Sequence, residues 1–257
     1  FLIDRNILTI IVDAAQIDAE SHVLEVGPGL GSVTQELSAR ASEVVAVEVD
    51  DDMIEALQVT LADCSNAQVV KSDILKTSPE QIGLSQDVVW TLVGNLPYYI
   101  TSPILEWIAA YKSIFNRAVL MVQKEVAQRL IAAPGSEDYS SFTAYLSYYF
   151  NIYRVANVSR NVFFPPPDVD SAVICLDTLT EPPIKVLNEE TLFAVIRASF
   201  GMRRKTLYNA LGTSPQLNWG KEKTALVLKN AGIDPGRRGE TLSLEEFGRI
   251  ADEYTNL

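Results

Sequence analysis

Histidine and cysteine are scarce in this sequence of 257 residues, and it has no long uninterrupted hydrophobic run. His22 is the single histidine, which excludes most zinc sites and any Ser-His or Cys-His nucleophile pair without it. We expect His22 to be an ordinary surface residue in front of a strand. The two cysteines, Cys64 and Cys175, cannot form a disulfide framework, which favours a reducing cytoplasm. Any chemistry should therefore need little proton shuttling.

Signals for a membrane or for secretion are also lacking. The longest stretch without a formal charge, residues 88–105, is interrupted by glycine, asparagine and two prolines, so we expect no transmembrane helix. The first five residues, FLIDR, do not have the pattern of a secretory signal. With 47% hydrophobic and 21% charged residues, the chain has enough apolar material for a large core and should be globular.

Basic residues are outnumbered, and the net charge of −12 argues at first against nucleic acid as a partner. The charge is unevenly distributed, however. Residues 177–257 hold 11 of the 21 basic and 11 of the 33 acidic residues, so this segment is neutral and residues 1–176 carry the whole negative excess. Local patches of charge must therefore decide whether the protein binds a polyanion.

Five short apolar runs, rich in β-branched residues, have the pattern of strands that are buried on both faces. They cover residues 23–26, 44–49, 68–70, 90–93 and 118–122. Amphipathic segments at residues 33–41, 53–62 and 104–111 lie between them and predict helices. This alternation predicts an α/β fold with a doubly wound, mostly parallel sheet, whose ligands bind beyond the carboxyl ends of the strands.

The second half of the chain has a different pattern. We predict helices at residues 124–132 and near 142–150, followed by strands near 152–158 and 172–176 that form an antiparallel edge. After the segment TEPP at residues 180–183 the pattern predicts helices only, at residues 190–200, 204–211, 221–231 and 244–254. We therefore predict two domains, residues 1–180 and a small all-helical domain at residues 184–257.

A glycine-rich segment, EVGPGLG at residues 25–31, follows the first predicted strand and opens a helix, where glycines let a ligand approach the backbone closely. Its GxGxG spacing differs from the GxGxxG fingerprint of dinucleotide sites, which disfavours nicotinamide and flavin. Glu48 ends the next strand, where a carboxylate can bind both ribose hydroxyls, and Asp73 is placed to bind an adenine amine. Each feature alone also occurs at purely structural turns. The glycine-rich turn and the two acids together, each at the end of a successive strand, favour a nucleoside cofactor. The glycine spacing favours S-adenosylmethionine.

The most specific motif, Asn95-Leu96-Pro97-Tyr98, closes the fourth predicted strand. An adenine amine is a poor nucleophile because its lone pair is delocalised into the ring. The Asn95 side-chain oxygen and the backbone carbonyl before Pro97 can accept both N–H groups and aim the lone pair at a sulfonium methyl group, while Pro97 keeps these acceptors rigid. Tyr98 offers a face for the base. Cytosine C5 methylation would need a thiolate where Tyr98 stands, so amine methylation fits better; the alternative is a plain turn.

Two further features point to nucleic acid. The segment FFPPPDVDS at residues 163–171 places Phe163 and Phe164 in a stiff loop, where one ring can cover the second face of a flipped-out base, unless both rings fill the junction between the domains. The run Arg203-Arg204-Lys205, which we place at a helix start, and the pair Arg237-Arg238 are candidate phosphate contacts. Solvated surface is the alternative, but the helix dipole disfavours cations at an amino end.

Together, EVGPGLG, Glu48, the segment SDIL at residues 72–75, NLPY, the F-x-P-x-P-x-V-x-S stretch, RRKTL and RRGETLS resemble the ribosomal RNA adenine dimethyltransferase family over the whole chain. Within the family, the sequence is most similar to the bacterial enzymes that dimethylate two adjacent adenosines near the 3′ end of small-subunit ribosomal RNA. The erythromycin-resistance relatives share the catalytic motifs but resemble the small domain less. The resemblance implies a Rossmann-like class I methyltransferase fold.

The resemblance also implies roles for individual residues. Contacts to S-adenosylmethionine are implied for Leu2, Gly27, Gly29, Glu48, Asp73 and Asn95. Asn95, Leu96, Pro97 and Tyr98 are implied to hold the target amine, with Phe163 against the base. The sequence departs from the family pattern at two places. The family usually begins with a basic segment that ends in Gly-Gln-Asn-Phe-Leu, whereas this sequence starts at Phe1-Leu2, so part of the cofactor lid is expected to be missing. Met202 stands where relatives often have Gln.

We therefore expect a cytoplasmic, S-adenosylmethionine-dependent RNA methyltransferase that acts as a monomer, without a metal, on small-subunit ribosomal RNA in an assembling 30S-type subunit. Arg203, Arg204, Lys205, Arg237 and Arg238 are its expected RNA contacts. The alternatives are adenine methylation of large-subunit RNA or of DNA, and an RNA-binding ribosome-assembly factor with little turnover.

Overall fold

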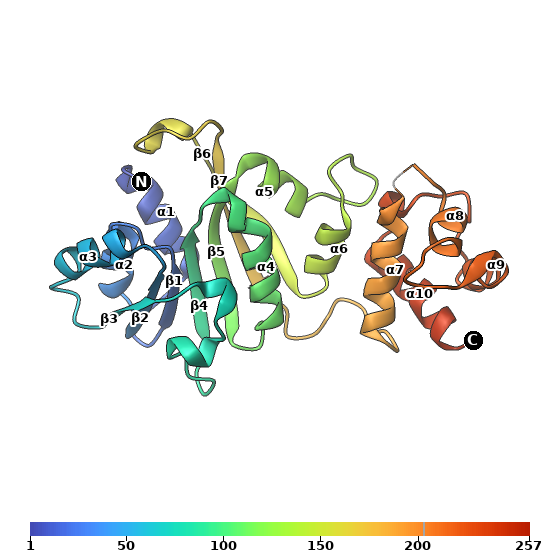
Figure 1. Ribbon diagram of the computed structural model, residues 1–257, viewed down its shortest axis with the longest axis horizontal. Helices are drawn as coiled ribbons and strands as arrows, with labels where there is room; N and C mark the ends of the chain where they lie inside the picture. Colours follow the sequence, from blue (N-terminus) through green and yellow to red (C-terminus); the bar gives the residue numbers. More distant parts are fainter. Residues whose placement is uncertain (203) are drawn as a thin grey trace. The chain divides into compact units, whose positions relative to one another are not determined.

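A computed structural model describes residues 1–202 and 204–257, which form two compact units (Figure 1). The first, called here the sheet unit, comprises residues 1–127 and 151–178, and the second, the helical unit, comprises residues 128–150 and 179–257. The sequence placed the domain boundary near residue 180 and assigned residues 128–150 to the first domain. In the structure these residues belong to the helical unit instead. The reason is packing, because Tyr139, Ala144 and Tyr148 are buried in the core of the helical unit.

Seven strands form one sheet, with the order β3-β2-β1-β4-β5-β7-β6. They are β1 (His22–Val26), β2 (Glu43–Glu48), β3 (Ala67–Lys71), β4 (Trp90–Asn95), β5 (Phe115–Gln123), β6 (Phe150–Val158) and β7 (Ser171–Thr178). The first five strands are parallel, and β7 pairs antiparallel with β5. The predicted doubly wound, mostly parallel sheet is therefore confirmed. The two late strands, β7 and β6, lie at the edge of the sheet as expected, and the antiparallel pairing is that of β7 with β5.

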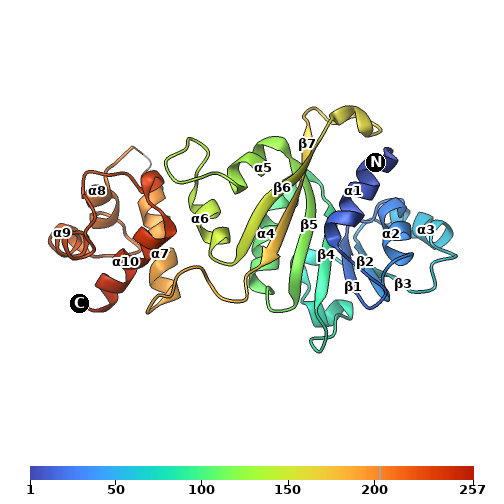
Figure 2. The same ribbon diagram turned by 180° about the vertical axis from the view of Figure 1, so that it is seen from behind.

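Helices cover both faces of this sheet. They are α2 (Ser32–Ser38), α3 (Asp51–Thr60) and α4 (Thr101–Ala110), with α5 (Lys124–Leu130) following β5, and the 3₁₀ turns η1 (Ile74–Lys76), η2 (Pro79–Ile82), η3 (Tyr98–Ile100) and η4 (Arg160–Val162) lie in the connections. Helix α4 lies on the opposite face from α1 (Arg5–Ala15), as Figure 2 shows from behind. Valines from neighbouring strands, among them Val23, Val44 and Val93, form the apolar layer beneath α1 and α2.

Helix α1 (Arg5–Ala15) was not expected from the sequence. The carboxylate of Asp4 caps it by accepting hydrogen bonds from the backbone N–H groups of Asn6 and Ile7, at 2.8 and 3.1 Å. Ile11 and Val12 on its buried face join the apolar layer on the sheet. The cap and the apolar spacing are therefore the signals by which the sequence could have predicted this helix.

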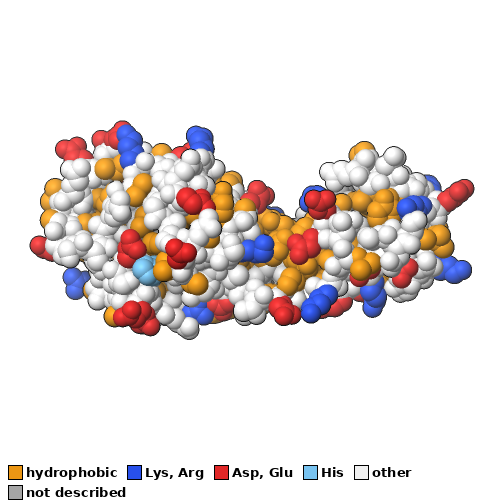
Figure 3. All heavy atoms as spheres, turned by 90° about the horizontal axis from the view of Figure 1, so that it is seen from below, with side chains coloured by type: hydrophobic (Ala, Val, Ile, Leu, Met, Phe, Trp, Pro, Cys, Tyr) orange, Lys and Arg blue, Asp and Glu red, His pale blue; other side chains and the backbone are white. Residues whose placement is uncertain are grey.

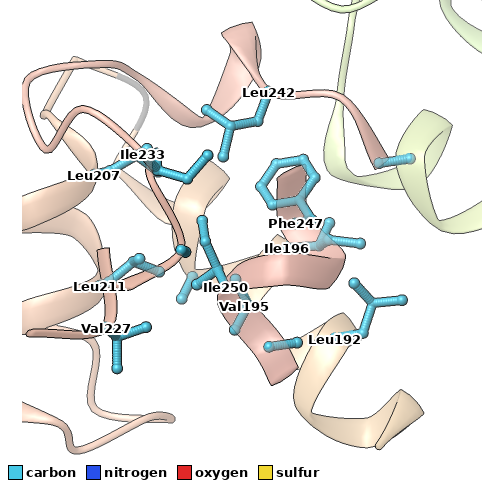
Figure 4. Close-up of a cluster of buried hydrophobic side chains, with 14 of the residues drawn as sticks. Leu192, Val195, Ile196, Leu207, Leu211, Val227, Ile233, Leu242, Phe247 and Ile250 are labelled. Atoms are coloured by element: carbon cyan, nitrogen blue, oxygen red, sulfur yellow. The ribbon is translucent and has the colours of Figure 1, made fainter. Parts of the chain in front are cut away.

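The helical unit has its own core. It contains α6 (Ser141–Ser147), α7 (Glu189–Gly201), α8 (Leu207–Gly212), α9 (Gly220–Asn230) and α10 (Leu244–Thr255), with the 3₁₀ turn η5 (Gly239–Thr241). Side chains from the last four helices point toward one another in Figure 4, where Phe247 and Ile250 of α10 meet Val195 and Ile196 of α7. The Ser243 hydroxyl and the Glu246 carboxylate form a capping box that fixes the start of α10.

Acidic side chains lie beside the single histidine, which is pale blue in the surface view of Figure 3. The Nδ1 atom of His22 lies 3.0 Å from Oε2 of Glu43 on the neighbouring strand, and its ring centroid is 5.3 Å from that of Trp90. His22 is therefore a partly exposed strand residue, held by local contacts. Among the described residues, we find no helix with the length and apolarity needed to span a membrane.

Candidate active site

A cavity of about 840 Å³ opens at the carboxyl ends of the strands of the sheet unit. The chain winds from β1 through β2 to β3 on one side and continues through β4 to β5 on the other, so β1 and β4 are neighbours at the switch point. Ligands of open α/β sheets bind at such a point. The walls of the cavity come from the ends of these strands, the start of α1 and the proline-rich loop before β7.

The glycine-rich segment forms the floor of the cavity at the end of β1. Gly27 has a φ of +70° and donates its backbone N–H to the carbonyl of Val47 at 3.0 Å. A Cβ atom at Gly27 would make only an ordinary contact of 3.8 Å with the backbone oxygen of Asn95, so it is the left-handed backbone of this turn that favours glycine here. Gly29 lines the same cavity, and both residues are where the sequence predicted them.

The two predicted acidic residues also line the cavity. Oε1 of Glu48 accepts the backbone N–H groups of Val49 and Asp50 at 2.8 and 3.1 Å, which fixes the carboxylate at the end of β2. Asp73 caps η1 by accepting the N–H of Leu75, and Lys76 pairs with its other oxygen at 2.8 Å. The hydrogen bond from Lys76 lowers the pKa of Asp73, which favours the ionised carboxylate with its acceptor oxygens.

Glu25 is a third acid at the cavity, to which the sequence reading gave no role. Its side chain is 2% exposed, and within the described chain its Oε2 atom has no hydrogen-bond partner. Burial raises the pKa of Glu25 to about 7; the Thr34 side chain opposes this shift, and the charge of Glu48 adds to it. An acid inside the apolar run HVLEV was the available signal, because buried acids without a partner are rare in structural strands.

The motif Asn95-Leu96-Pro97-Tyr98 borders the cavity at the end of β4. Within the described residues, no protein group forms a hydrogen bond with the side chain of Asn95, so its amide is available to a ligand. Leu96 is 3% exposed and anchors the turn, since its Cδ2 atom packs tightly against Gly94, 3.1 Å from the position that a Cβ atom there would take. The Tyr98 hydroxyl lies 2.9 Å from Oγ of the buried Ser171.

This last contact joins two motifs that are 73 residues apart in the chain. Ser171 is the final residue of the F-x-P-x-P-x-V-x-S stretch and the first residue of β7. The sequence motif includes Ser171, but no role for this residue was predicted from it. We assign it the positioning of the Tyr98 ring, because the hydrogen bond restrains the hydroxyl end of that ring.

Two predicted site residues that are far apart in the sequence, Leu2 and Phe163, meet at the cavity. Leu2 and Phe163 form an isolated antiparallel bridge, and the N–H of Ile3 donates to the carbonyl of Val162 at 3.0 Å. Both Leu2 and Phe163 line the cavity, as the predicted cofactor and base contacts require. Phe163 also packs against the apolar layer of the sheet, so one of its faces is structural.

The predicted cationic contacts lie in the helical unit. Arg203 is outside the described residues. Arg204 and Lys205 are exposed and precede α8 instead of starting it, because Thr206 is the N-cap and the helix dipole disfavours cations in the first turn. Arg204 and Arg238, distant in sequence, line one cavity of about 450 Å³ together with Glu137 and Glu240.

Arg237 has a different environment from the other predicted cations. Its guanidinium binds Glu246 through two hydrogen bonds of 2.5 and 2.9 Å and donates to the carbonyl of Thr241 at 2.6 Å. These contacts fix the loop before α10. The structure therefore gives Arg237 an internal role, whereas Arg204, Lys205 and Arg238 are exposed to solvent, and Arg238 lies 3.8 Å from the carboxylate of Glu240.

Comparison with known proteins identifies relatives along the whole chain. The family model described as "Ribosomal RNA adenine dimethylase" matches residues 1–256. The chain is 46% identical over 260 residues to "Ribosomal RNA small subunit methyltransferase A" of Bacillus mycoides, covering 98% of this chain and 88% of that protein. It is 44% identical over 252 residues to the protein of the same name from Clostridium botulinum (strain Okra), covering 98% and 90%.

Solved structures agree with this result. The crystal structure of a dimethyladenosine transferase from Plasmodium falciparum matches with a TM-score of 0.84 and 27% identity, covering 97% of this chain and 95% of that one. The structure of the 23S rRNA methyltransferase ErmE matches with a TM-score of 0.76 and 27% identity, covering 99% of each chain. The matched lengths include the sheet unit and the helical unit alike. On these grounds, the chain belongs to the ribosomal RNA adenine dimethylase family.

Proposed function

We propose that this chain is an S-adenosylmethionine-dependent enzyme that dimethylates the exocyclic amines of two adjacent adenosines near the 3′ end of small-subunit ribosomal RNA. Family membership and the names of the relatives at 44–46% identity support this assignment. The observation that carries it is one cavity that has the acceptors Glu48 and Asp73 on one side and Asn95 to Tyr98 on the other. One cavity thus has space for a nucleoside cofactor beside an adenine base.

The residues present fit S-adenosylmethionine. The fixed carboxylate of Glu48 can accept hydrogen bonds from ribose hydroxyls, and Asp73 can accept the adenine amine. The unpaired Oε2 atom of Glu25 is buried at the floor and can accept a hydrogen bond from the ammonium or hydroxyl groups of a ligand. When bound, the cofactor supplies a sulfonium methyl group as the electrophile. Leu2, Gly27 and Gly29 would close around it.

The chain's own residues act mainly by positioning and polarisation. The Asn95 side-chain oxygen and the carbonyl of Leu96 accept the two N–H groups of the adenine amine, which concentrates its lone pair on nitrogen. Tyr98, restrained by Ser171, and Phe163 hold the faces of the base. The methylated ammonium that forms on the base is acidic enough to release its proton to water, so no histidine is required. His22, bound to Glu43, is not part of this site.

RNA outside the cavity is held by the helical unit in this proposal. Arg204, Lys205 and Arg238 supply phosphate contacts, and Arg203 is retained from the sequence as a further candidate. We also propose that the enzyme acts as a monomer in the cytoplasm on an assembling small subunit. None of these steps requires a metal ion.

Methyl transfer from labelled S-adenosylmethionine to unmethylated small ribosomal subunits tests the proposal directly. Unmethylated large subunits and duplex DNA serve as parallel acceptors. We expect label in dimethyladenosine of the small-subunit RNA alone. Label in large subunits or in DNA would instead support the other adenine substrates, and tight binding without label would support an assembly factor.

Asn95→Ala tests the assigned chemistry. Removing the acceptor should lower kcat by about 100-fold, the usual effect of losing one preorganised polar contact to a reacting centre. Binding of small subunits should be retained, because the expected phosphate contacts are in the helical unit. Wild-type turnover by this variant would refute the assigned role of Asn95.

A further inference from the structure

Two large aromatic side chains are exposed at the edge of the cavity and have no role in the reaction described above. Tyr99 is 83% exposed and lines the cavity, while Phe164 is 70% exposed and lies between two lining residues, Phe163 and Pro165. Each follows an aromatic residue that is anchored, since Tyr98 is held by Ser171 and Phe163 by the apolar layer. Each loop therefore places one ring at the site and a second ring toward solvent.

The backbone holds both exposed rings in place. Tyr99 is in η3, where the N–H of Ile100 donates to the carbonyl of Pro97 at 3.1 Å. The N–H of Phe164 donates to the carbonyl of Phe1 at 2.8 Å, and Pro165 follows directly. A single exposed apolar side chain is common on protein surfaces. Two aromatic rings on separate, restrained loops at one ligand cavity instead form an exposed apolar surface on which a planar group, such as a nucleobase, can stack.

The chemistry of the substrate identifies the partner. RNA that delivers one base into a cavity must unstack it, and the bases on either side lose a stacking neighbour. Exposed tyrosine and phenylalanine rings can replace that stacking. Stacking needs no positive charge on the protein, so it can bind RNA at the sheet unit, which carries the negative excess of the chain. A peptide or membrane partner would not follow from the position of these rings beside the adenine site.

We propose that Tyr99, assisted by Phe164, is a stacking subsite for the nucleotide adjoining the adenosine in the cavity. This inference rests on the proposed function and deepens it. Because the two target adenosines are adjacent, the base held at this subsite is the second target whenever the first one occupies the cavity. The subsite thus selects paired targets and keeps the RNA in register for the second methylation.

Kinetics with unmethylated small subunits and labelled S-adenosylmethionine test the subsite. Tyr99→Ala should raise KM for the subunits about tenfold, as expected for the loss of one base–aromatic stack. It should also shift the products toward dimethylation of only one adenosine, measured by mass spectrometry of RNA fragments. The Kd for S-adenosylmethionine should not change, which shows that the variant is folded. Phe164→Ala should shift both readouts in the same direction.

Two variants serve as controls. Tyr99→Phe keeps the ring and should recover most of the lost affinity. Val59→Ala removes a hydrophobic side chain that is 77% exposed on α3 and should behave as wild type. A KM and product ratio of Tyr99→Ala equal to those of wild type would overturn the subsite. Failure of the wild-type protein itself to label small subunits would contradict the proposed function instead, so the two failures are distinguishable.

Discussion

The Glu25 carboxyl lies in β1 at the cavity and is almost fully buried, with 2% of the residue exposed. Burial raises its pKa to about 7 from the ordinary value of 4.5. The protonated form is favoured by the folded state, and the unfolded chain ionises at lower pH. The stabilisation from this group is therefore complete below the unfolded pKa and is lost as the pH rises through about 7.

We predict that the free energy of unfolding of the wild-type protein decreases relative to Glu25→Gln by about 2 kcal/mol between pH 5.5 and pH 8. The amide has similar volume but does not ionise, so its own titration is absent. Urea denaturation of both proteins at several pH values measures the difference, and the range avoids low solubility near the sequence pI of about 4.6. Parallel stability curves would show that Glu25 ionises in the same way in the folded and unfolded chain.

At the scale of an element, the turn from β1 into α2 depends on Gly31. It has a φ of +84°, and a Cβ atom there would lie 3.0 Å from Leu57 and 3.1 Å from both Leu61 and Thr60. These residues belong to α3 and its C-cap, so the missing side chain lets α2 and α3 pack together. Glycine is therefore favoured at position 31 for two reasons, the positive φ of the backbone and the lack of space for a Cβ atom.

Gly31→Ala should lower the free energy of unfolding by about 3 kcal/mol, from a left-handed backbone strain of about 1 to 2 kcal/mol and an added overpacking cost. Gly83→Ala is the matched control, because Gly83 has a φ of +87° and no atom within 4 Å of the added Cβ. Thermal or urea unfolding of the two variants separates strain from packing. Equal losses in both would show that the contacts with α3 contribute nothing.

The sequence predicted the parallel strands and the cavity residues well, because buried strands carry continuous apolar runs and the motifs stand at their ends. Gly27, Glu48, Asp73 and Asn95 all line one cavity, as expected. It did not predict α1, because no role was assigned to its cap at Asp4. Contacts between distant residues, such as Tyr98 with Ser171, depend on the pairing of β5 with β7, which no local pattern specifies.

At the scale of the whole molecule, the two units differ in charge. The helical unit contains 12 basic and 12 acidic residues and is neutral, so the sheet unit carries the negative excess. Affinity for a polyanion must then come from local groups of cations and should be sensitive to salt. Arg204, Lys205 and Arg238 are exposed candidates, whereas Arg237 is committed to Glu246.

We predict that replacing Arg204, Lys205 and Arg238 together with Gln lowers the affinity for unmethylated small subunits and reduces the slope of log K against log[salt] by about 2 to 3, one phosphate contact for each cation. Filter binding across a series of KCl concentrations gives both quantities. Lys229→Gln is the matched control, because it removes an exposed cation of α9 from the same unit. A wild-type slope in the triple variant would mean that these cations are only solvated, and that the RNA is held by other surfaces. Methyl transfer at saturating subunits should be unchanged in the triple variant, since the reacting groups lie in the sheet unit, whose core these substitutions do not touch.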